Sequence, residues 1–431
     1  MKTKIFILSI IASTIALVSC SDEPSNNIDD FPLNYKITEV KATQDIAVGC
    51  MIVDPYNDFK SNSTRWERLT DTYSPNDGKI GPYVRPAASP EGMYAIMGSA
   101  EDEQDEHARQ IGRIVGEMKK ARIDFVITPG MRETKALYPN NINRDDSLFL
   151  NIISGRNKDL AWSNDGSTKF AIQVNMQNFA SSNGFSSYSS VMEDRPDDTY
   201  SSNGQTITLT KKERFLSYIR NLAKYMNEPT YYRLEDGRPI IYLRECEKFY
   251  VRDVKGIFDG IRETVEEVCG ANPYIICSMP EWTIAPRYQY MILDGEPDGL
   301  SPLNMAYYGS GSGKFELLYM WDILHNENFK YNVEYLKANN PATTFIPSVS
   351  NGYCRYILEG TYNLFGADPG EEGMRKRCWL AKMNMGNIPL VIFDSYNDWA
   401  KGNFIEPTDP DYGNGVGELY LDILREEFKV N

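Results

Sequence analysis

Residues 388–407 read IPLVIFDSYNDWAKGNFIEP, and this stretch decides the fold that the sequence predicts. It begins with an unbroken apolar run, which is typical of a strand buried on both faces, and then turns abruptly polar. In a parallel α/β barrel the catalytic groups lie at the carboxyl ends of the strands, so Asp394, Asn397 and Asp398 stand where chemistry is expected. The alternative is a plain strand and a capped loop, with Asn397 or Asp398 as a helix N-cap.

Seven further apolar runs read as strands, and amphipathic patterns between them read as helices. The other strands are predicted at 45–53, 123–128, 169–175, 238–245, 273–282, 299–308 and 343–350. Helices are predicted at 101–121, 211–226, 251–268, 315–338, 371–385 and 417–428, and the Ser-, Asn- and Gly-rich segment 176–209 is predicted to be a mobile loop. Eight alternating units favour an α/β fold, a (β/α)8 TIM barrel with enlarged βα loops. No Gly-rich phosphate loop follows the first strand to indicate an open doubly wound sheet.

Residues 395–407, SYNDWAKGNFIEP, resemble the S-W-N-E-W-x-E-G-x-x-x-E-P signature of glycoside hydrolase family 99 and of related domains attached to polysaccharide glycosyltransferases. Asn, Trp, Gly, Glu and Pro fall in register. Asp398 and Lys401 depart, because the family has Glu at both positions. The resemblance implies retaining endo-α-mannoside cleavage, in which the first Glu deprotonates the sugar 2-hydroxyl and the second protonates the leaving oxygen.

The catalytic candidates follow from the need for two carboxyl groups across one glycosidic bond. Asp398 keeps the base position, whereas the charged ammonium of Lys401 does not easily replace an acid. Glu245 and Glu281 each close an apolar run at the predicted carboxyl face, so either could supply the missing acid. The alternative for Glu245 is an ion pair with a neighbouring arginine, and for Glu281 a charge at a helix N-terminus. Glu406 is assigned a structural role.

Substrate-binding candidates are polar and aromatic side chains at the predicted strand ends. Carboxylates can accept hydrogen bonds from sugar hydroxyls, and rigid rings can stack on sugar faces. The candidates are Asp54, Tyr56, Trp282, Tyr308, Tyr353, Asp394, Tyr396, Asn397, Trp399 and Lys401. For any single ring the alternative is an ordinary core position, and Trp399 in particular could be a core anchor.

Charge and composition exclude some partners. The net charge of −15 and the pI near 4.8 argue against nucleic acid or another polyanion, while a neutral glycan is compatible with them. With two His residues and no Cys pair at ligand spacing, the sequence suggests no cofactor, zinc site or Ser-His-Asp triad. An acidic rim could still hold calcium without a linear motif. The six cysteines after Cys20 are predicted to be mostly free thiols.

The N-terminus predicts export and anchoring. Lys2 and Lys4 precede a short apolar core and then Cys20, a pattern that resembles a bacterial lipoprotein signal. The acidic residues after Cys20 resemble the tag that sends Bacteroidetes lipoproteins to the outer surface. We therefore expect a signal peptide at 1–19, a lipidated tether at 20–44 and one barrel domain at 45–431. An ordinary signal with a chance Cys is the alternative.

The sequence predicts a cell-envelope lipoprotein of the outer membrane, which could be exposed at the cell surface and which hydrolyses an α-linked, mannan-like glycan. The alternative is a barrel that has lost hydrolysis and holds a glycan by stacking and hydrogen bonds.

Overall fold

The computed structural model describes residues 35–52, 63–70, 82–88, 112–129, 168–176, 196–202, 205–246, 251–279, 284, 286–302, 321–354, 356–357, 360, 365–367 and 370–430. The chain divides into two units, Met1–Ile37 and Thr38–Asn431, and every element below belongs to the second. Among the described helices, none has both the length and the apolar character needed to cross a membrane.

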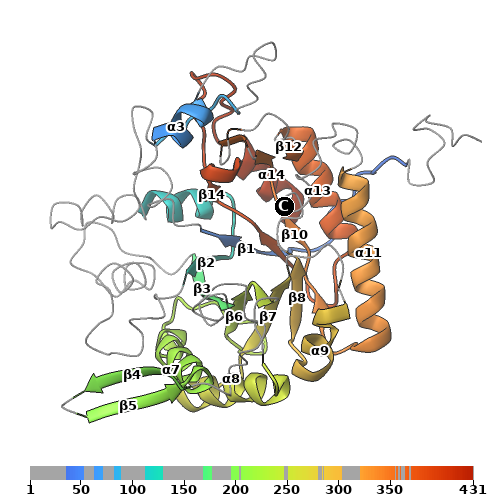
Figure 1. The fold of residues 1–431 in the computed structure, drawn as a ribbon. Coiled ribbons are helices and arrows are strands. Elements are labelled where there is room, and N and C mark those ends of the chain that lie inside the picture. Colours follow the sequence, from blue (N-terminus) through green and yellow to red (C-terminus); the bar gives the residue numbers. More distant parts are fainter. Residues whose placement is uncertain are drawn as a thin grey trace, which may run out of the picture. The chain divides into compact units, whose positions relative to one another are not determined.

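The centre of the fold is a parallel sheet of nine strand segments (Figure 1). In their order across the sheet these are β10 (Ser348–Val349), β13 (Leu390–Phe393), β1 (Ala47–Met51), β2 (Phe125–Pro129), β3 (Lys169–Asn175), β6 (Ile240–Arg244), β7 (Tyr274–Met279), β8 (Gly299–Pro302) and β9 (Thr344–Phe345). Nearly all described residues of these segments are buried, and β7 and β13 are buried along their whole length. Burial on both faces explains why the sequence shows continuous apolar runs instead of alternation.

The sheet closes on itself through the segment 344–349. Its first half, β9, pairs with β8, and its second half, β10, pairs with β13. Backbone hydrogen bonds continue the two ladders, from Ile346 N to Leu300 O and from Ile392 N to Pro347 O. The two ends of the nine-segment order are therefore one strand, and the sheet forms an eight-stranded barrel.

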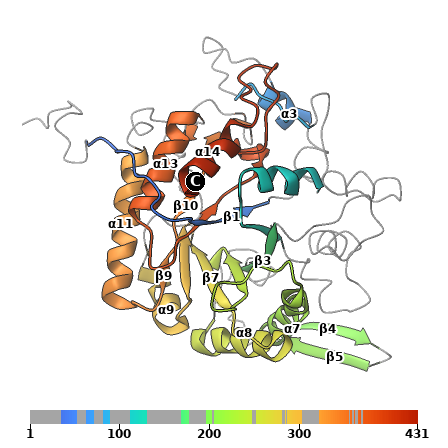
Figure 2. The same ribbon diagram turned by 180° about the vertical axis from the view of Figure 1, so that it is seen from behind.

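Helices surround the strands, as Figures 1 and 2 show from opposite sides. The described helices are α3 (Ser63–Thr70), 112–120, α7 (Lys211–Ala223) with the 3-10 turn η5 (Lys224–Asn227), α8 (Val254–Cys269), α9 (Pro286–Gly295), α11 (Trp321–Asn339), α13 (Glu371–Met383) and α14 (Leu419–Phe428). Local sequence explains their ends. Thr210 and Glu213 form a capping box at the start of α7, and Gly270 ends α8 in the left-handed conformation.

The predicted barrel is confirmed, because a described strand lies in each of the eight runs that the sequence singled out. Helices α7, α8, α11, α13 and α14 overlap their predicted ranges, and the described part of the predicted helix 101–121 is helical over 112–120. One prediction was wrong. The segment 176–209 contains part of an antiparallel hairpin, β4 (Pro196–Ser202) with β5 (Gln205–Thr210), which projects beside α7 (Figure 2). Helices α3 and α9 were not predicted.

Candidate functional site

The loop after β13 is held in a compact form by its own backbone and by one serine. Segments β14 (Asn397–Asp398) and β15 (Asn403–Phe404) pair antiparallel across a 3-10 turn, η8 (Trp399–Lys401). Ser395 Oγ accepts a hydrogen bond from Asp398 N at 2.9 Å and donates one to Asn403 O at 3.0 Å. The polar residues of the 394–398 stretch are thereby fixed at the carboxyl end of β13. Asp398 stands at the N-cap position of η8, as the alternative interpretation expected, but its side chain makes no capping hydrogen bond to that turn.

The turn in this loop requires glycine at residue 402. Gly402 has φ +64°, in the left-handed region that other residues avoid. A Cβ atom there would also lie 2.8 Å from Cys354 Cβ, closer than carbon atoms normally approach. The turn therefore depends on glycine for its backbone conformation and for the close approach of a neighbouring segment.

Asp398 and Lys401 form an ion pair inside this loop. Lys401 Nζ lies 2.6 Å from Asp398 Oδ2, and the side chains are 22% and 5% exposed. Burial alone would lower the pKa of Lys401, but the carboxylates of Asp398 and Asp394 outweigh that effect and raise it. Lys401 is therefore a firmly protonated cation, and the Asp398 carboxylate has a fixed positive partner.

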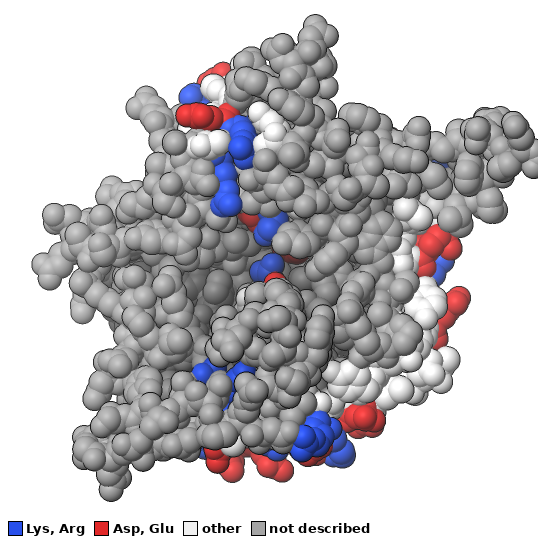
Figure 3. Space-filling model, viewed as in Figure 1, with Lys and Arg blue, Asp and Glu red and all other residues white. Residues whose placement is uncertain are grey.

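A second charged group, Arg244, enters the same region from the end of β6. Its positive charge interacts with the carboxylates of Asp394, Glu245 and Asp398, and these interactions outweigh burial and raise its pKa. The charge of Asp394 also adds to the effect of burial in raising the pKa of the Cys50 thiol. The ends of β1, β6 and β13 thus share one electrostatic environment. Figure 3 shows Lys and Arg atoms beside Asp and Glu atoms, recessed near the middle of one face.

The opposite side of the loop is anchored to the helix at 112–120. Trp399 Nε1 donates to Glu406 Oε2 at 2.7 Å, and Arg113 Nη2 lies 2.6 Å from Glu406 Oε1. Arg113 also pairs with Glu117, at 2.8 Å, and the Tyr396 hydroxyl donates to Glu117. Glu406 is fully buried, which agrees with the structural role expected for it.

This arrangement corrects the stacking role suggested for two rings. Tyr396 is 0% exposed and Trp399 is 1% exposed. Trp399 stacks on Phe404 with ring centroids 3.8 Å apart, so protein occupies one of its faces. Both rings support the loop, and Trp399 is the core anchor that was considered as the alternative. Sequence reasoning missed Arg113 and Glu117, although their i, i+4 spacing on a predicted helix was a usable signal.

The remaining candidates divide into two groups. Tyr353, in β11 (Tyr353–Cys354), is buried, and β11 pairs with β12 (Phe365–Ala367). Glu245 has φ +59° directly after β6, and its backbone N donates to Ser278 Oγ at 3.0 Å. The candidates that lie outside the described residues are Cys20, Asp54, Tyr56, Glu281, Trp282 and Tyr308.

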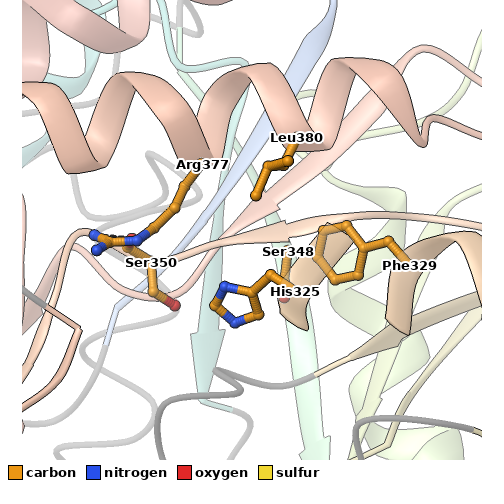
Figure 4. Close-up of a pocket in the computed structure, with 6 residues that line it drawn as sticks. All are labelled: His325, Phe329, Ser348, Ser350, Arg377 and Leu380. Atoms are coloured by element: carbon orange, nitrogen blue, oxygen red, sulfur yellow. Dashed lines mark hydrogen bonds between the residues drawn. The ribbon is translucent and has the colours of Figure 1, made fainter. Parts of the chain in front are cut away.

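Two further features bear on alternative sites. The described residues contain no group of three or more His, Cys, Asp or Glu side chains that could hold a metal ion. A small cavity lies between α11, α13 and β10, as Figure 4 shows. It is lined by His325, Phe329, Ser348, Ser350, Arg377 and Leu380. The cysteines after Cys20 are free thiols, and all but Cys269 are buried.

A residue that lines the small cavity also supports the loop after β13. Arg377 Nη1 donates to the carbonyl of Asn351, and Asn351 Nδ2 donates in turn to Phe404 O at 2.8 Å. Beside Arg377, burial lowers the pKa of His325 to about 3, and the nearby guanidinium adds to the effect. This cavity is thus part of the scaffold of β15.

Comparison with known proteins identifies the fold. The sequence matches no protein family profile, and it matches no curated protein. One solved structure, a glycoside hydrolase-like protein, superposes with a TM-score of 0.67 at 21% identity, covering 92% of this chain and 98% of its own. The GH99 endo-α-mannosidase from Bacteroides thetaiotaomicron superposes with a TM-score of 0.51 at 15% identity, covering 89% of this chain and 96% of its own. The chain shares the barrel fold of these two structures. The resemblance seen in residues 395–407 therefore extends, at the level of fold, over most of the chain.

Proposed function

We propose that this protein binds a carbohydrate at the carboxyl end of its barrel and does not cleave it by the two-carboxylate route of glycosidases. The observation that carries this proposal is the ion pair of Asp398 with Lys401. By the motif resemblance, these two residues occupy the positions of the family's base and acid. A carboxyl group that could donate a proton is replaced there by an ammonium that retains its proton.

The chemistry of the second position argues against proton donation to a leaving oxygen. A general acid works best when its pKa lies near the working pH. The pKa of Lys401 is raised above its already high ordinary value. An ammonium of that kind gives up its proton reluctantly, so the acid step has no effective donor at Lys401.

The same groups suit retention of a sugar. Asp394 and Asp398 offer carboxylate oxygens that can accept hydrogen bonds from hydroxyl groups, and Lys401 offers ammonium hydrogens to hydroxyl oxygens. Their side chains are held by a loop that hydrogen-bonds to itself, so little conformational entropy is lost on binding. Binding therefore does not need the two glutamates that the family signature has at positions 398 and 401.

Hydrolysis of an α-linked, mannan-like glycan is the second candidate. One observation favours it: Glu245 follows β6 directly and belongs to the same electrostatic environment as Asp398, through Arg244. In this scheme Asp398 acts as the base and Glu245 or Glu281 acts as the acid. The endo-α-mannosidase activity named for the second comparison structure belongs to that protein, and for this chain it is part of the proposal only.

The two candidates are separated by measuring binding and product release in parallel on a panel of α-mannans and other α-glycans. Wild type, Asp398→Asn and the double variant Asp398→Glu with Lys401→Glu would be compared. Retention without products by wild type supports the binding function. Products from wild type that vanish in Asp398→Asn would reject it in favour of hydrolysis. The double variant restores both glutamates of the signature, and any cleavage that it gains would show that only these positions limit catalysis.

We also propose that the protein is a lipoprotein of the outer membrane, anchored through Cys20 and exposed at the cell surface. The basic start, the apolar core and Cys20 support this, as does the acidic stretch after it. Labelling with a fatty acid analogue should mark wild type and not Cys20→Ala. Protease treatment of intact cells would test the exposure, because a protein on the inner leaflet would survive it.

A further inference from the structure

Arg244 differs from the other buried or half-buried arginines that support the site. Arg113 contacts Glu117 and Glu406, and Arg377 contacts Asp322 and two backbone carbonyls. The Nε atom of Arg244 is buried without a hydrogen-bond partner, and no hydrogen bond or ion pair joins its guanidinium to another described residue. A guanidinium carries five donors, so this one leaves much hydrogen-bonding capacity unused within the described part of the chain.

The position of Arg244 places these unused donors at the carboxyl end of the barrel, where the candidate site lies. Arg244 is the last residue of β6, and its side chain alternates with Leu243 and shares a face with Tyr242. The Tyr242 hydroxyl lies near Ser278 and Ser301, in the interior layer of the barrel. Arg244 is therefore the outermost member of an inward-facing row, at the carboxyl end of the barrel.

The neighbouring carboxylates act on Arg244 without contacting it. Asp394, Glu245 and Asp398 are close enough to stabilise its charge. Asp398 is paired with Lys401, however, and Asp394 and Glu245 have further partners of their own. These carboxylates stabilise the charge, but they leave the buried Nε donor without a hydrogen-bond partner, and a ligand that supplies an anionic group can accept hydrogen bonds from the guanidinium.

We propose that Arg244 recognises an anionic group, a carboxylate or a sulfate, on the bound carbohydrate. This inference rests on the proposed function and names the class of its ligand. The planar guanidinium matches a carboxylate or sulfate with two parallel hydrogen bonds, which a neutral hydroxyl cannot accept. Lys401 lies near enough to Arg244 for the two charges to repel, so it adds a second positive group at the same place.

The protein's net charge limits the kind of anionic ligand. At −15 the whole molecule repels a polyanion, as it repels nucleic acid. A short oligosaccharide with one charged residue avoids most of that long-range repulsion. Close to Arg244, the carboxylates of Asp394, Asp398 and Glu245 still oppose an anion, so binding depends on direct hydrogen bonds from the guanidinium and not on the field alone. The ligand we infer is therefore a largely neutral glycan with an isolated uronate or sulfated sugar.

The test compares calorimetric binding of three matched probes: a neutral manno-oligosaccharide, the same chain with one uronate, and the same chain with one sulfate ester. Wild type should bind at least one charged probe about tenfold more tightly than the neutral one, since hydrogen bonds to charged groups are the strong ones. The preference should weaken as salt is raised. A preference for the uronate or for the sulfate ester identifies the source of the anionic group.

Two variants and one control link the preference to Arg244. Arg244→Gln should abolish it, and Arg244→Lys should retain only part of it, because lysine keeps the charge and loses the planar fork. Arg220→Gln is the matched control, since Arg220 pairs with Glu267 at 2.6 Å on the exposed surface, where both side chains are at least half exposed. This control should behave as wild type.

The outcomes distinguish this inference from the proposed function. Equal affinity of wild type for all three probes would overturn the inference and leave the carbohydrate-binding function standing. A preference that survives in both folded Arg244 variants would also overturn it. Binding of none of the probes or of the wider glycan panel would overturn both.

Discussion

The loop that follows β13 has two sides that differ in how completely its polar groups are paired. On the side facing the helix at 112–120, Glu406 has both oxygens bonded, to Trp399 and to Arg113. On the side facing the barrel opening, Lys401 and Asp398 pair with each other, while Arg244 contacts no described partner. The first side, which we call the closed side, fixes the shape of the loop. The second, which we call the open side, holds the residues that we propose for the ligand.

This difference explains how a signature can be kept while its chemistry changes. Trp399, Gly402 and Glu406 match the family signature, and all three act on the closed side or in the turn. The two departures, Asp398 and Lys401, lie on the open side. The matching residues therefore report the geometry of the loop, and they carry no information about whether a glycosidic bond is cleaved.

The largest expected effect comes from removing the carboxylate of the closed side. Glu406→Ala leaves Arg113 and the Trp399 indole without their buried partner, and breaking such a pair costs about 3–5 kcal/mol of unfolding free energy. Urea unfolding measures this. Glu418→Ala is the control, because the Lys120–Glu418 pair is exposed to solvent and should contribute little to stability. Similar losses in both variants would contradict the division into two sides.

Glycine substitutions test the turn between the two sides. Gly402→Ala introduces a side chain at φ +64° and a contact with Cys354, so we expect a loss of about 2–4 kcal/mol. Gly417 has the same φ, and a Cβ atom added there would meet nothing within 4 Å, so Gly417→Ala should show only the backbone cost of about 1–2 kcal/mol. The difference in stability loss between the two variants, measured by thermal unfolding, gives the cost of the contact with Cys354. Equal losses would mean that this contact contributes nothing.

The scaffold behind β15 should make the closed side sensitive to acid. Because the pKa of His325 is lowered to about 3, the folded protein keeps this imidazole neutral while the unfolded chain protonates it below about pH 6.5. Stability is therefore lost as pH falls from about 6.5 toward 3. The loss is at most about 1.4 kcal/mol per pH unit, or roughly 2 kcal/mol at pH 5.

His325→Gln measures this contribution by difference. Urea unfolding between pH 7.5 and pH 4.5 should give a flatter profile for the variant than for wild type, because glutamine does not titrate. Parallel profiles would mean that His325 is protonated without penalty in the folded state.

The smallest effect on stability is expected from the open side. Changing Asp398→Asn and Lys401→Gln together removes both charges and leaves groups of similar size, so the unfolding free energy should change by less than about 1 kcal/mol. Binding of the glycan panel should nevertheless fall. A loss of stability as large as that of Glu406→Ala would show that the open side also holds the loop together.

The sequence predicted the barrel well because buried parallel strands leave a strong signal. Each of the eight apolar runs contains a strand, and even the weak run at 299–308 holds β8. The hairpin of β4 and β5 was missed because β4, PDDTYSS, has no apolar pattern, and the alternation in β5, QTITLT, rests on only two apolar residues. Asn203-Gly204 between them was a usable turn signal.

The site was predicted less completely, for a physical reason. The sequence placed Asp394, Asp398 and Lys401 together, but it could not tell which residues of the loop face inward, because the turn fixed by Ser395 and Gly402 breaks the alternation of a strand. Two aromatic residues of the loop were therefore interpreted as ligand contacts and proved to be supports. The sequence also could not show that no described residue contacts the guanidinium of Arg244. Such contacts depend on distances across the barrel, which no local pattern encodes.

The closing segment 344–349 has a consequence for how the chain acquires its fold. Strand β1 pairs with β13 from Ala47↔Leu390 onward, so its neighbour on one side lies near the far end of the chain. Until β13 has been made, β1 and β10 each have an edge of unpaired peptide groups, and a chain that stops before Leu390 keeps both edges open. Such non-local pairing slows folding, and incomplete chains of this protein are expected to associate through those edges.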